Sequence, residues 1–337
     1  MIKNRFSTKG FEFIEFVVEN TTKLHEFFIN LGFVEMAHHV THNITQYKQG
    51  NIIFILSDHD AYPFAHEFFK THGPSVCSFG ITVNDPAWTR DTLIKEGCKS
   101  HHTTIPCIEG VGGSRLYFAN KLAYTEFYYM NNPLNNNIGL VDIDHITHNV
   151  EIGKLDYWAK WYHDKFNFEE IKYFDIRGKH TGLLSRAMAD PSGNVRIPIN
   201  EPTETGSQIQ EYLDKYNGSG IQHIALSTKD IYTTVEILRN NGVKFLAVPD
   251  TYYDQLETRI PEHGENTNEL QRLKILLDGK PDKETGLLLQ LFTTCQVGPI
   301  FFEIIQRKGN TGFGEGNFQA LFTAMEDDQI KRGVLNS

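Results

Sequence analysis

The chain has 337 residues, of which 40% are hydrophobic and 22% are charged, with a formal net charge of −10. This length supplies two ordinary domains with a core each, and the acidic balance argues against a nucleic-acid-binding protein, whose surface is usually basic. No apolar run has the length of a transmembrane helix or a signal peptide, and the four cysteines include no C-x-x-C pair. We therefore expect a cytoplasmic globular protein with reduced thiols.

The first quarter of the chain predicts a strand, a helix and further strands. Residues 11–18 read as a strand, and Thr21 or Thr22 offers a side chain that can cap the next helix. Gly32 ends that helix, because glycine adopts the left-handed conformation at no steric cost. The apolar segments that follow, among them residues 51–56, indicate further strands.

The same order of elements recurs in the next part of the chain. Residues 78–83 form the predicted strand, and Asn84 or Asp85 is the predicted helix cap. Pro86 suits the first helical position, and Gly97 ends the helix. This segment is the second copy of one strand–helix–strands unit.

Two more copies of the unit follow. The third has a strand at residues 143–150 and a helix that ends at Asn167, the residue type after glycine that best tolerates the left-handed conformation. The fourth has a strand at residues 221–227, a cap at Asp230 and a stop at Gly242. The chain therefore contains one structural unit four times.

Four such units imply two similar domains of the α+β class. The clearest internal match aligns residues 75–85 with residues 220–230, which pairs the second copy with the fourth. The polar segment 131–139 contains one proline and suits a boundary between domains. We expect an N-terminal domain at residues 1–132 and a C-terminal domain at residues 140–337.

Three ionisable residues lie in the middle of apolar strands. His145 and His223 occupy the first strands of the third and fourth copies, and Glu303 lies within Ile-Phe-Phe-Glu-Ile-Ile. A buried carboxylate needs a cation or a proton, because an unpaired charge in an apolar core is strongly disfavoured. Two imidazoles and one carboxylate are the protein ligands of a facial-triad iron site, whereas a structural zinc site usually has a fourth protein ligand. Core packing of each residue alone is the competing interpretation.

Two neighbouring observations sharpen this hypothesis. His148 is three residues from His145, and residues three apart on a strand face opposite sides, so His148 is not expected to be a ligand. In the first half, Ser78 stands where His223 stands, and Glu126 is matched with Glu303. We therefore expect the N-terminal domain to hold no metal.

At these residues the chain resembles the 4-hydroxyphenylpyruvate dioxygenases, a family of the vicinal oxygen chelate superfamily. The resemblance covers the second domain almost throughout and the first more loosely. Its segments are residues 196–202, 207–212, 220–225, 288–293, 301–307 and 312–318. It implies two vicinal-oxygen-chelate domains of paired βαβββ modules, which form an open barrel around a metal site in the C-terminal domain.

The resemblance also implies roles for individual residues. His145, His223 and Glu303 would bind one Fe(II) per chain. Phe313 and Phe318 would sandwich the substrate ring, and a C-terminal helix from about Asn317 to Lys331 would close over the iron. The further substrate-side positions are Ser185, Asn200, Gln208, Gln222, Gln290, Phe292 and Asn317.

The activity implied is the conversion of 4-hydroxyphenylpyruvate and O2 to homogentisate and CO2 in tyrosine and phenylalanine catabolism. It combines oxidative decarboxylation, ring hydroxylation and side-chain migration in a homodimer or homotetramer. Two alternatives stay open from the sequence. One is benzylic hydroxylation of the same substrate, as in 4-hydroxymandelate synthases, and the other is a metal-dependent binding protein of the same superfamily without turnover.

Overall fold

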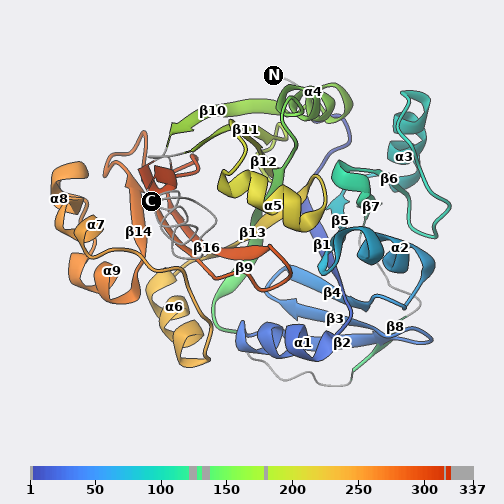
Figure 1. Cartoon of the computed structure of the whole chain (residues 1–337), viewed down its shortest axis with the longest axis horizontal. Coiled ribbons are helices and arrows are strands. Elements are labelled where there is room, and N and C mark those ends of the chain that lie inside the picture. Colours follow the sequence, from blue (N-terminus) through green and yellow to red (C-terminus); the bar gives the residue numbers. More distant parts are fainter. Residues whose placement is uncertain (1–2, 121–126, 131–136, 178–180, 315, 320–337) are drawn as a thin grey trace.

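The computed structural model describes residues 3–120, 127–130, 137–177, 181–314 and 316–319. It contains two eight-stranded mixed sheets, one in each half of the chain. Figure 1 shows the first half in blue to teal toward the right and the second half in green to red toward the left. Each half carries its helices around its own sheet.

The first half contains the sheet of order β6-β7-β5-β1-β4-β3-β2-β8. Its elements are β1 Gly10–Val18, α1 Thr21–Asn30, β2 Val34–His39, β3 Ile44–Gln49, β4 Ile52–Asp58, α2 Pro63–His72, β5 Ser75–Thr82, α3 Pro86–Lys95, β6 Cys107–Glu109, a 3-10 turn Val111–Gly113, β7 Arg115–Ala119 and β8 Phe127–Tyr129.

The second half contains the sheet of order β10-β11-β12-β9-β13-β16-β15-β14. Its elements are β9 Leu140–Asn149, α4 Leu155–Phe166, β10 Glu169–Arg177, β11 Gly182–Ala189, β12 Arg196–Pro202, α5 Gln208–Tyr216, β13 Gly220–Thr228, α6 Ile231–Asn240, α7 Thr251–Asp254, α8 Leu256–Arg259, α9 Thr267–Leu273, β14 Leu276–Gly279, β15 Leu287–Phe292 and β16 Phe301–Lys308.

The predicted α+β class and the fourfold strand–helix–strands repeat are confirmed. The first strands of the paired units, β1 with β5 and β9 with β13, lie antiparallel at the centre of each sheet. Asp85 and Asp230 cap their helices as predicted, by accepting from Trp88 N and Thr233 N. Asn167 has the expected left-handed conformation with φ of 57°.

Two local predictions were wrong or incomplete. The N-cap of α1 is Asn20, whose side chain accepts from the amide of Thr22, so neither threonine is the cap. Asparagine and threonine can both cap a helix N-terminus, so the sequence pattern does not distinguish Asn20 from Thr21 as the cap. Helices α2 and α5, which join the units within each half, were not expected at all.

The central strand pairs of the two halves share the same irregularities. Residues 145–147 of β9 pair regularly with residues 223–225 of β13, and the register shifts at each end of this stretch. Asp144 and Gln222 are the extra residues of the two resulting β-bulges. Between β1 and β5 the shifts leave Glu12 and Cys77 as the extra residues. Glu12 and Cys77 match Asp144 and Gln222 in the repeat, so the central strand pairs of the two halves have the same backbone arrangement.

The two halves pack through a shared aromatic cluster. Phe302 on β16 lies 5.3 to 6.0 Å, ring centre to ring centre, from Phe16, Phe27 and Phe54 of the first half. All four side chains are buried in one continuous core. Because Phe302 and Glu303 alternate on one strand, the ring faces the first half while the carboxylate faces the interior of the second sheet.

Most of the expected C-terminal helix, Asn317 to Lys331, lies outside the described residues, and residues 316–319 are helical. Glu126 also lies outside them. No helix in the described part of the chain is both long and apolar enough to cross a membrane.

Candidate metal centre

Three strands of the second sheet bring His145, His223 and Glu303 together. His145 Nε2 lies 3.3 Å from His223 Nε2 and 3.2 Å from Glu303 Oε2, and His223 Nε2 lies 3.4 Å from the same oxygen. The three residues are 2%, 4% and 1% exposed. Their donor atoms therefore converge on one point inside the sheet.

The strand register explains this convergence. Ala225 on β13 is the direct partner of His145 on β9 and of Glu303 on β16. His223 is two residues before Ala225, and side chains two apart on a strand share a face. Three neighbouring strands thus present one ligand each to the same side.

Each imidazole is held by the residue before it in the chain. Asp144 Oδ1 lies 2.8 Å from His145 Nδ1, and Gln222 Oε1 lies 3.0 Å from His223 Nδ1. In a regular strand these neighbours would face away from the histidines, but both are the extra residues of β-bulges. The bulges therefore place a hydrogen-bond acceptor beside each Nδ1.

These acceptors determine which ring nitrogen faces the centre. A carboxylate or an amide oxygen can only accept, so each Nδ1 donates and each Nε2 presents its lone pair. The Thr147 hydroxyl, 3.0 Å from His223 Nε2, can donate to one of them. Two lone pairs and a carboxylate at 3.2 to 3.4 Å repel one another without a cation between them. The donor set consequently fits a divalent metal ion.

The ionisation of the centre follows from its neighbours. Burial alone would raise the pKa of Glu303, but the imidazoles of His145 and His223 outweigh burial and lower that pKa to about 2. Burial lowers the pKa of His223, whereas the carboxylates of Glu303 and Asp144 overcome burial and raise the pKa of His145. Glu303 is therefore an ionised ligand at neutral pH.

An ion pair behind His145 was not expected from the sequence. Arg307 Nε and Nη2 lie 2.7 and 2.8 Å from the two carboxylate oxygens of Asp144, and Arg196 Nη1 lies 3.4 Å away. Burial alone would raise the pKa of Asp144, but Arg307 and His145 hold it below its usual range. The signal in the sequence was an acidic residue directly before a candidate ligand in an apolar strand.

The predicted polar residues Gln290 and Asn317 form a chain that ends at Glu303. Gln290 Nε2 donates to Glu303 Oε1 at 2.8 Å and to the Phe313 carbonyl oxygen at 3.2 Å. Asn317 Nδ2 donates to Gln290 Oε1 at 2.9 Å, and Tyr252, which sequence reasoning missed, donates to Asn317 Oδ1 at 2.7 Å. This chain orients the carboxylate and ties Phe313 and Asn317 to it.

A second polar group lies on the neighbouring strands. Asn200 Nδ2 lies 3.5 Å from Gln222 Oε1, and Ser185 is the direct strand partner of Asn200. The Ser185 hydroxyl is buried and has no hydrogen-bond partner among the described residues. Gln208 is buried at the start of α5. Ser185, Asn200 and Gln222 thus offer polar atoms on the side of His223.

The predicted aromatic residues do not all gather at one place. Phe313 lies 5.3 Å from His145 and Phe292 6.4 Å from His223, measured between ring centres. Phe318 instead packs against Phe174, at 5.4 Å. Phe301, which was not singled out, stacks on His223 at 4.9 Å. Three rings therefore enclose the two imidazoles, and the sandwich of Phe313 and Phe318 remains a prediction.

His148 lies apart from the three converging side chains. Its Nε2 lies 2.9 Å from the Tyr162 hydroxyl, and its ring packs 5.9 Å from Phe79 of the first half. Complete burial lowers the pKa of His148 to about 3, so the ring is neutral. This histidine belongs to the core between the two halves.

The first half has no such ligand set at the corresponding positions. Phe13, the partner of Gly80 on β5, takes the place of His145, and Ser78 takes that of His223. Tyr117 on β7 is the other partner of Gly80 and takes the place of Glu303. The match of Glu126 with Glu303 was therefore wrong, because the strand beside β5 is β7 and not the segment that contains residue 126.

Two family models match the chain. One is described as hydroxyphenylpyruvate dioxygenase, N-terminal, and matches residues 2–145. The other is the glyoxalase/bleomycin resistance protein/dioxygenase superfamily and matches residues 142–270. The two matches overlap at residues 142–145, within strand β9 of the second sheet.

Three curated proteins are similar over nearly the whole chain. Hemolysin VllY of Vibrio vulnificus is 46% identical over 99% of this chain and 98% of its own. The 4-hydroxyphenylpyruvate dioxygenase of Pseudomonas aeruginosa is 45% identical over 98% of this chain and 97% of its own. That of Legionella pneumophila is 48% identical over 97% and 96%.

Two solved structures share the fold. A xylose isomerase-like TIM barrel/4-hydroxyphenylpyruvate dioxygenase fusion protein superposes with a TM-score of 0.81 at 30% identity. The match covers 95% of this chain and 53% of the fusion protein, so this chain spans about half its length. A mutant of 4-hydroxymandelate synthase from Streptomyces coelicolor superposes with a TM-score of 0.83 at 24% identity, over 96% of this chain and 99% of that one. The expected vicinal-oxygen-chelate architecture is confirmed.

Proposed function

The chain belongs to the 4-hydroxyphenylpyruvate dioxygenase family, and we propose that it converts 4-hydroxyphenylpyruvate and O2 to homogentisate and CO2 with one Fe(II) ion. The observation that carries the proposal is the convergence of His145, His223 and Glu303 in a chain so similar to these enzymes along its full length. This reaction belongs to tyrosine and phenylalanine catabolism.

The donor set supports iron as the metal. Two neutral imidazoles and one carboxylate form a facial triad, and Fe(II) dioxygenases use this set with three further positions left open. When bound, Fe(II) would offer open positions to the 2-oxo acid of the substrate and to O2, and would activate O2 for reaction with that 2-oxo acid. The protein supplies Glu303 as the charged ligand, in a site where Asp144 is already neutralised by Arg307.

The surrounding side chains are proposed to position the substrate. Ser185, with its unused buried hydroxyl, and Asn200 and Gln222 face the side of His223 and can bind polar groups. Gln290 and Asn317 hold Glu303 and can turn their remaining hydrogen-bonding capacity toward the ring hydroxyl. Gln208 is assigned to the same polar lining.

Aromatic packing is proposed to select the ring and to exclude water. Phe292 and Phe313 already pack against the two imidazoles. Phe318 would complete the slot around the substrate ring together with the C-terminal helix. A site closed in this way keeps water from the reactive stages and fixes which ring carbon is attacked.

The same proposal includes the larger organisation of the protein. An N-terminal domain at residues 1–132 without a metal supports a C-terminal catalytic domain at residues 140–337. The enzyme works in the cytoplasm as a homodimer or homotetramer. Size measurement by light scattering tests this part, and a monomer at working concentration would contradict it.

Anaerobic reconstitution with Fe(II) and 4-hydroxyphenylpyruvate tests the central claim. We expect a charge-transfer absorption band, and on admission of air we expect O2 uptake, CO2 release and homogentisate. His223→Ala should abolish the band. His148→Phe is the matched control and should retain it, because this imidazole bonds to Tyr162 rather than facing the centre. Hydroxymandelate as the product, or binding without turnover, would contradict the assignment.

A further inference from the structure

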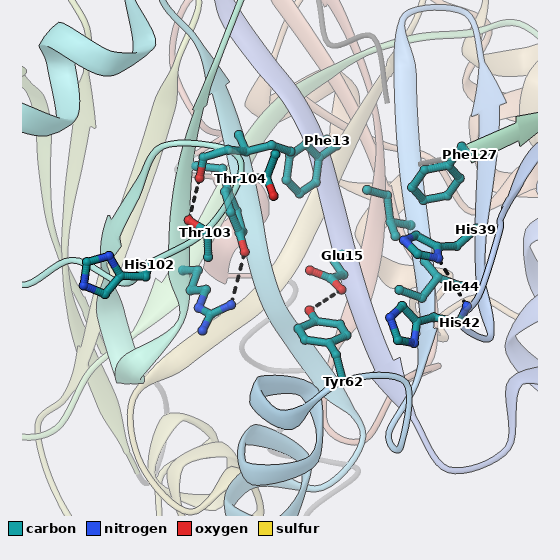
Figure 2. A pocket seen from close by; sticks show the side chains of 14 residues that line it. Phe13, Glu15, His39, His42, Ile44, Tyr62, His102, Thr103, Thr104 and Phe127 are labelled. Carbon is teal, nitrogen blue, oxygen red and sulfur yellow. Dashed lines mark hydrogen bonds between the residues drawn. The ribbon is translucent and has the colours of Figure 1, made fainter. Parts of the chain in front are cut away.

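The first half contains a cavity of about 360 Å³ at the place that corresponds to the metal centre. It is lined by Phe13 and Tyr117, the counterparts of His145 and Glu303, and by Glu15, Tyr62 and Arg115. Figure 2 shows Phe13, Glu15 and Tyr62 facing the same space, with His39, His42 and Phe127 on the opposite side. A cavity of this size can hold a small metabolite.

One wall of the cavity carries a buried carboxylate. Glu15 is 6% exposed and accepts hydrogen bonds from the hydroxyls of Ser57 at 2.7 Å, Tyr62 at 2.5 Å and Ser78 at 2.5 Å. Burial and Glu15 itself raise the pKa of Tyr62, so that hydroxyl stays a donor. Within the described part of the chain, no lysine, arginine or histidine forms an ion pair with Glu15.

The other wall carries a cation whose hydrogen-bonding capacity is only partly used. Arg115 lies over the Phe64 ring at 3.8 Å, and its Nη1 donates to the Tyr117 hydroxyl at 3.3 Å. Its Nε is buried without an acceptor, and no carboxylate among the described residues pairs with it. An unsatisfied buried guanidinium N–H is costly, which favours an anionic ligand beside it.

The strand register keeps these two charges apart. Ser78 on β5 is the direct partner of Glu15 on β1 and of Arg115 on β7. The two charged residues therefore stand on the same face with one strand between them, about 10 Å apart at the backbone. They form no ion pair with each other within the described chain. A ligand with one charge of each sign can bridge them.

The rest of the lining combines an apolar wall with the polar side chains of His39, His42, His102, Thr103 and Thr104. Phe13, Ile44, Ile55 and Tyr117 belong to a separate buried cluster of the first half, packed on the cavity side of the sheet. A ligand that fills the cavity must bury an apolar or aromatic group against them. The site therefore combines a carboxylate (Glu15), a guanidinium cation (Arg115) and an apolar wall.

We propose that this cavity is a binding site for a small zwitterion of the α-amino-acid class with an apolar or aromatic side chain. The ligand carboxylate contacts Arg115, the ammonium group contacts Glu15, and the side chain lies against Phe13 and Tyr117. The site is separate from the metal centre, so the inference goes beyond the proposed catalytic function and does not depend on it.

Calorimetry on the full-length Fe(II)-loaded protein under anaerobic conditions tests the proposal, with L-phenylalanine as the probe. Two matched compounds each lack one charge: 3-phenylpropionate has no ammonium group, and phenethylamine has no carboxylate. We expect one L-phenylalanine per chain, and affinities for the other two that are weaker by about tenfold or more, since each loses one charged contact.

Variants locate the binding site. Glu15→Gln and Arg115→Met should each weaken L-phenylalanine binding by about tenfold or more, since each removes one charged contact. Glu303→Gln, in the metal centre, should leave that binding unchanged.

Three results would overturn the proposal: no binding with Kd below about 1 mM, equal binding of the three compounds, or loss of binding in Glu303→Gln. The three compounds are compared on the unaltered protein, so this part of the test remains valid even if a variant fails to fold.

Discussion

The two halves of this protein place different side chains on the same strand frame. Phe13, Ser78 and Tyr117 occupy in the first half the positions that His145, His223 and Glu303 occupy in the second. The bulges of the central strand pair also coincide, at Glu12 and Cys77 in one half and at Asp144 and Gln222 in the other. Metal chemistry therefore depends on three side chains and their supports rather than on the backbone arrangement.

The halves also differ in how they stabilise a buried carboxylate. Glu15 stands at the position of Thr147 and is satisfied by three hydroxyl donors. Glu303 instead faces two imidazoles, and Asp144 faces Arg307. Hydroxyl donors leave the negative charge of Glu15 in place, whereas in the second half the Arg307 cation neutralises Asp144 and Glu303 stays available as the charged metal ligand. This difference suits the second half for a metal and the first for the zwitterionic ligand proposed above.

The largest effect is expected from Glu303→Gln. Loss of the charged ligand should reduce iron affinity and turnover well beyond the roughly 10–100-fold typical of residues that only support a ligand. Tyr117→Phe, at the same position of the first half, is the control and should leave iron binding unchanged. Metal content after dialysis and O2 uptake measure both. If Glu303→Gln retained iron and activity, Glu303 would not be a ligand that distinguishes the second half from the first.

Asp144→Asn tests the support behind His145. The change weakens the hydrogen bond to Nδ1 and leaves Arg307 without its carboxylate, so iron affinity should fall by about 10–100-fold. Glu12→Gln is the control, because Glu12 is the bulge counterpart and its carboxylate accepts a hydrogen bond from the Thr82 hydroxyl. Because the pKa of Asp144 is lowered in the folded protein, its stabilisation is present at neutral pH and is lost as the pH falls below about 4. Acid unfolding of the unmodified protein should show this loss, and Asp144→Asn should not.

Gly80→Ala tests the packing that replaces a ligand in the first half. A Cβ at Gly80 would lie 2.7 Å from the Phe13 ring, so the ring must shift, and we expect a loss of about 1–3 kcal/mol in unfolding free energy. The matched change Ala225→Gly, opposite His145, should cost about 1 kcal/mol or less. Urea unfolding measures both. If Gly80→Ala were as stable as the unmodified protein, the Phe13 ring would not occupy the space opposite Gly80 that the imidazole occupies opposite Ala225.

His148→Phe copies the first half at another shared position, where Phe16 stands. The pKa of His148 is about 3 in the folded protein, because burial disfavours the charged ring, and about 6.5 when unfolded. The unfolded chain therefore binds the extra proton first, and stability falls as the pH drops from about 6.5 toward 3. At pH 5 the loss is about 2 kcal/mol. The variant should lack this part of the pH dependence in thermal unfolding, and an unchanged profile would contradict the buried neutral ring.

Many features could be predicted from local patterns. The repeated order of a strand, a cap such as Asp85 or Asp230, and a helix stop such as Asn167 identified the four units. His145, His223 and Glu303 were recognisable because an ionisable side chain in an apolar strand needs a partner. Glu126 was matched with Glu303 incorrectly, since the sequence does not say which strand pairs with β5.

The sequence by itself determined the repeat, the two domains and the three ionisable residues at the centre of the second, because alternation and capping act between residues near in the chain. Only the tertiary structure decided that Asp144 and Gln222 support the histidines, that Arg307 neutralises Asp144, and that a charged cavity occupies the first half. Bulges reverse the direction of single side chains, and strand pairing joins residues far apart in sequence. Both depend on the whole sheet.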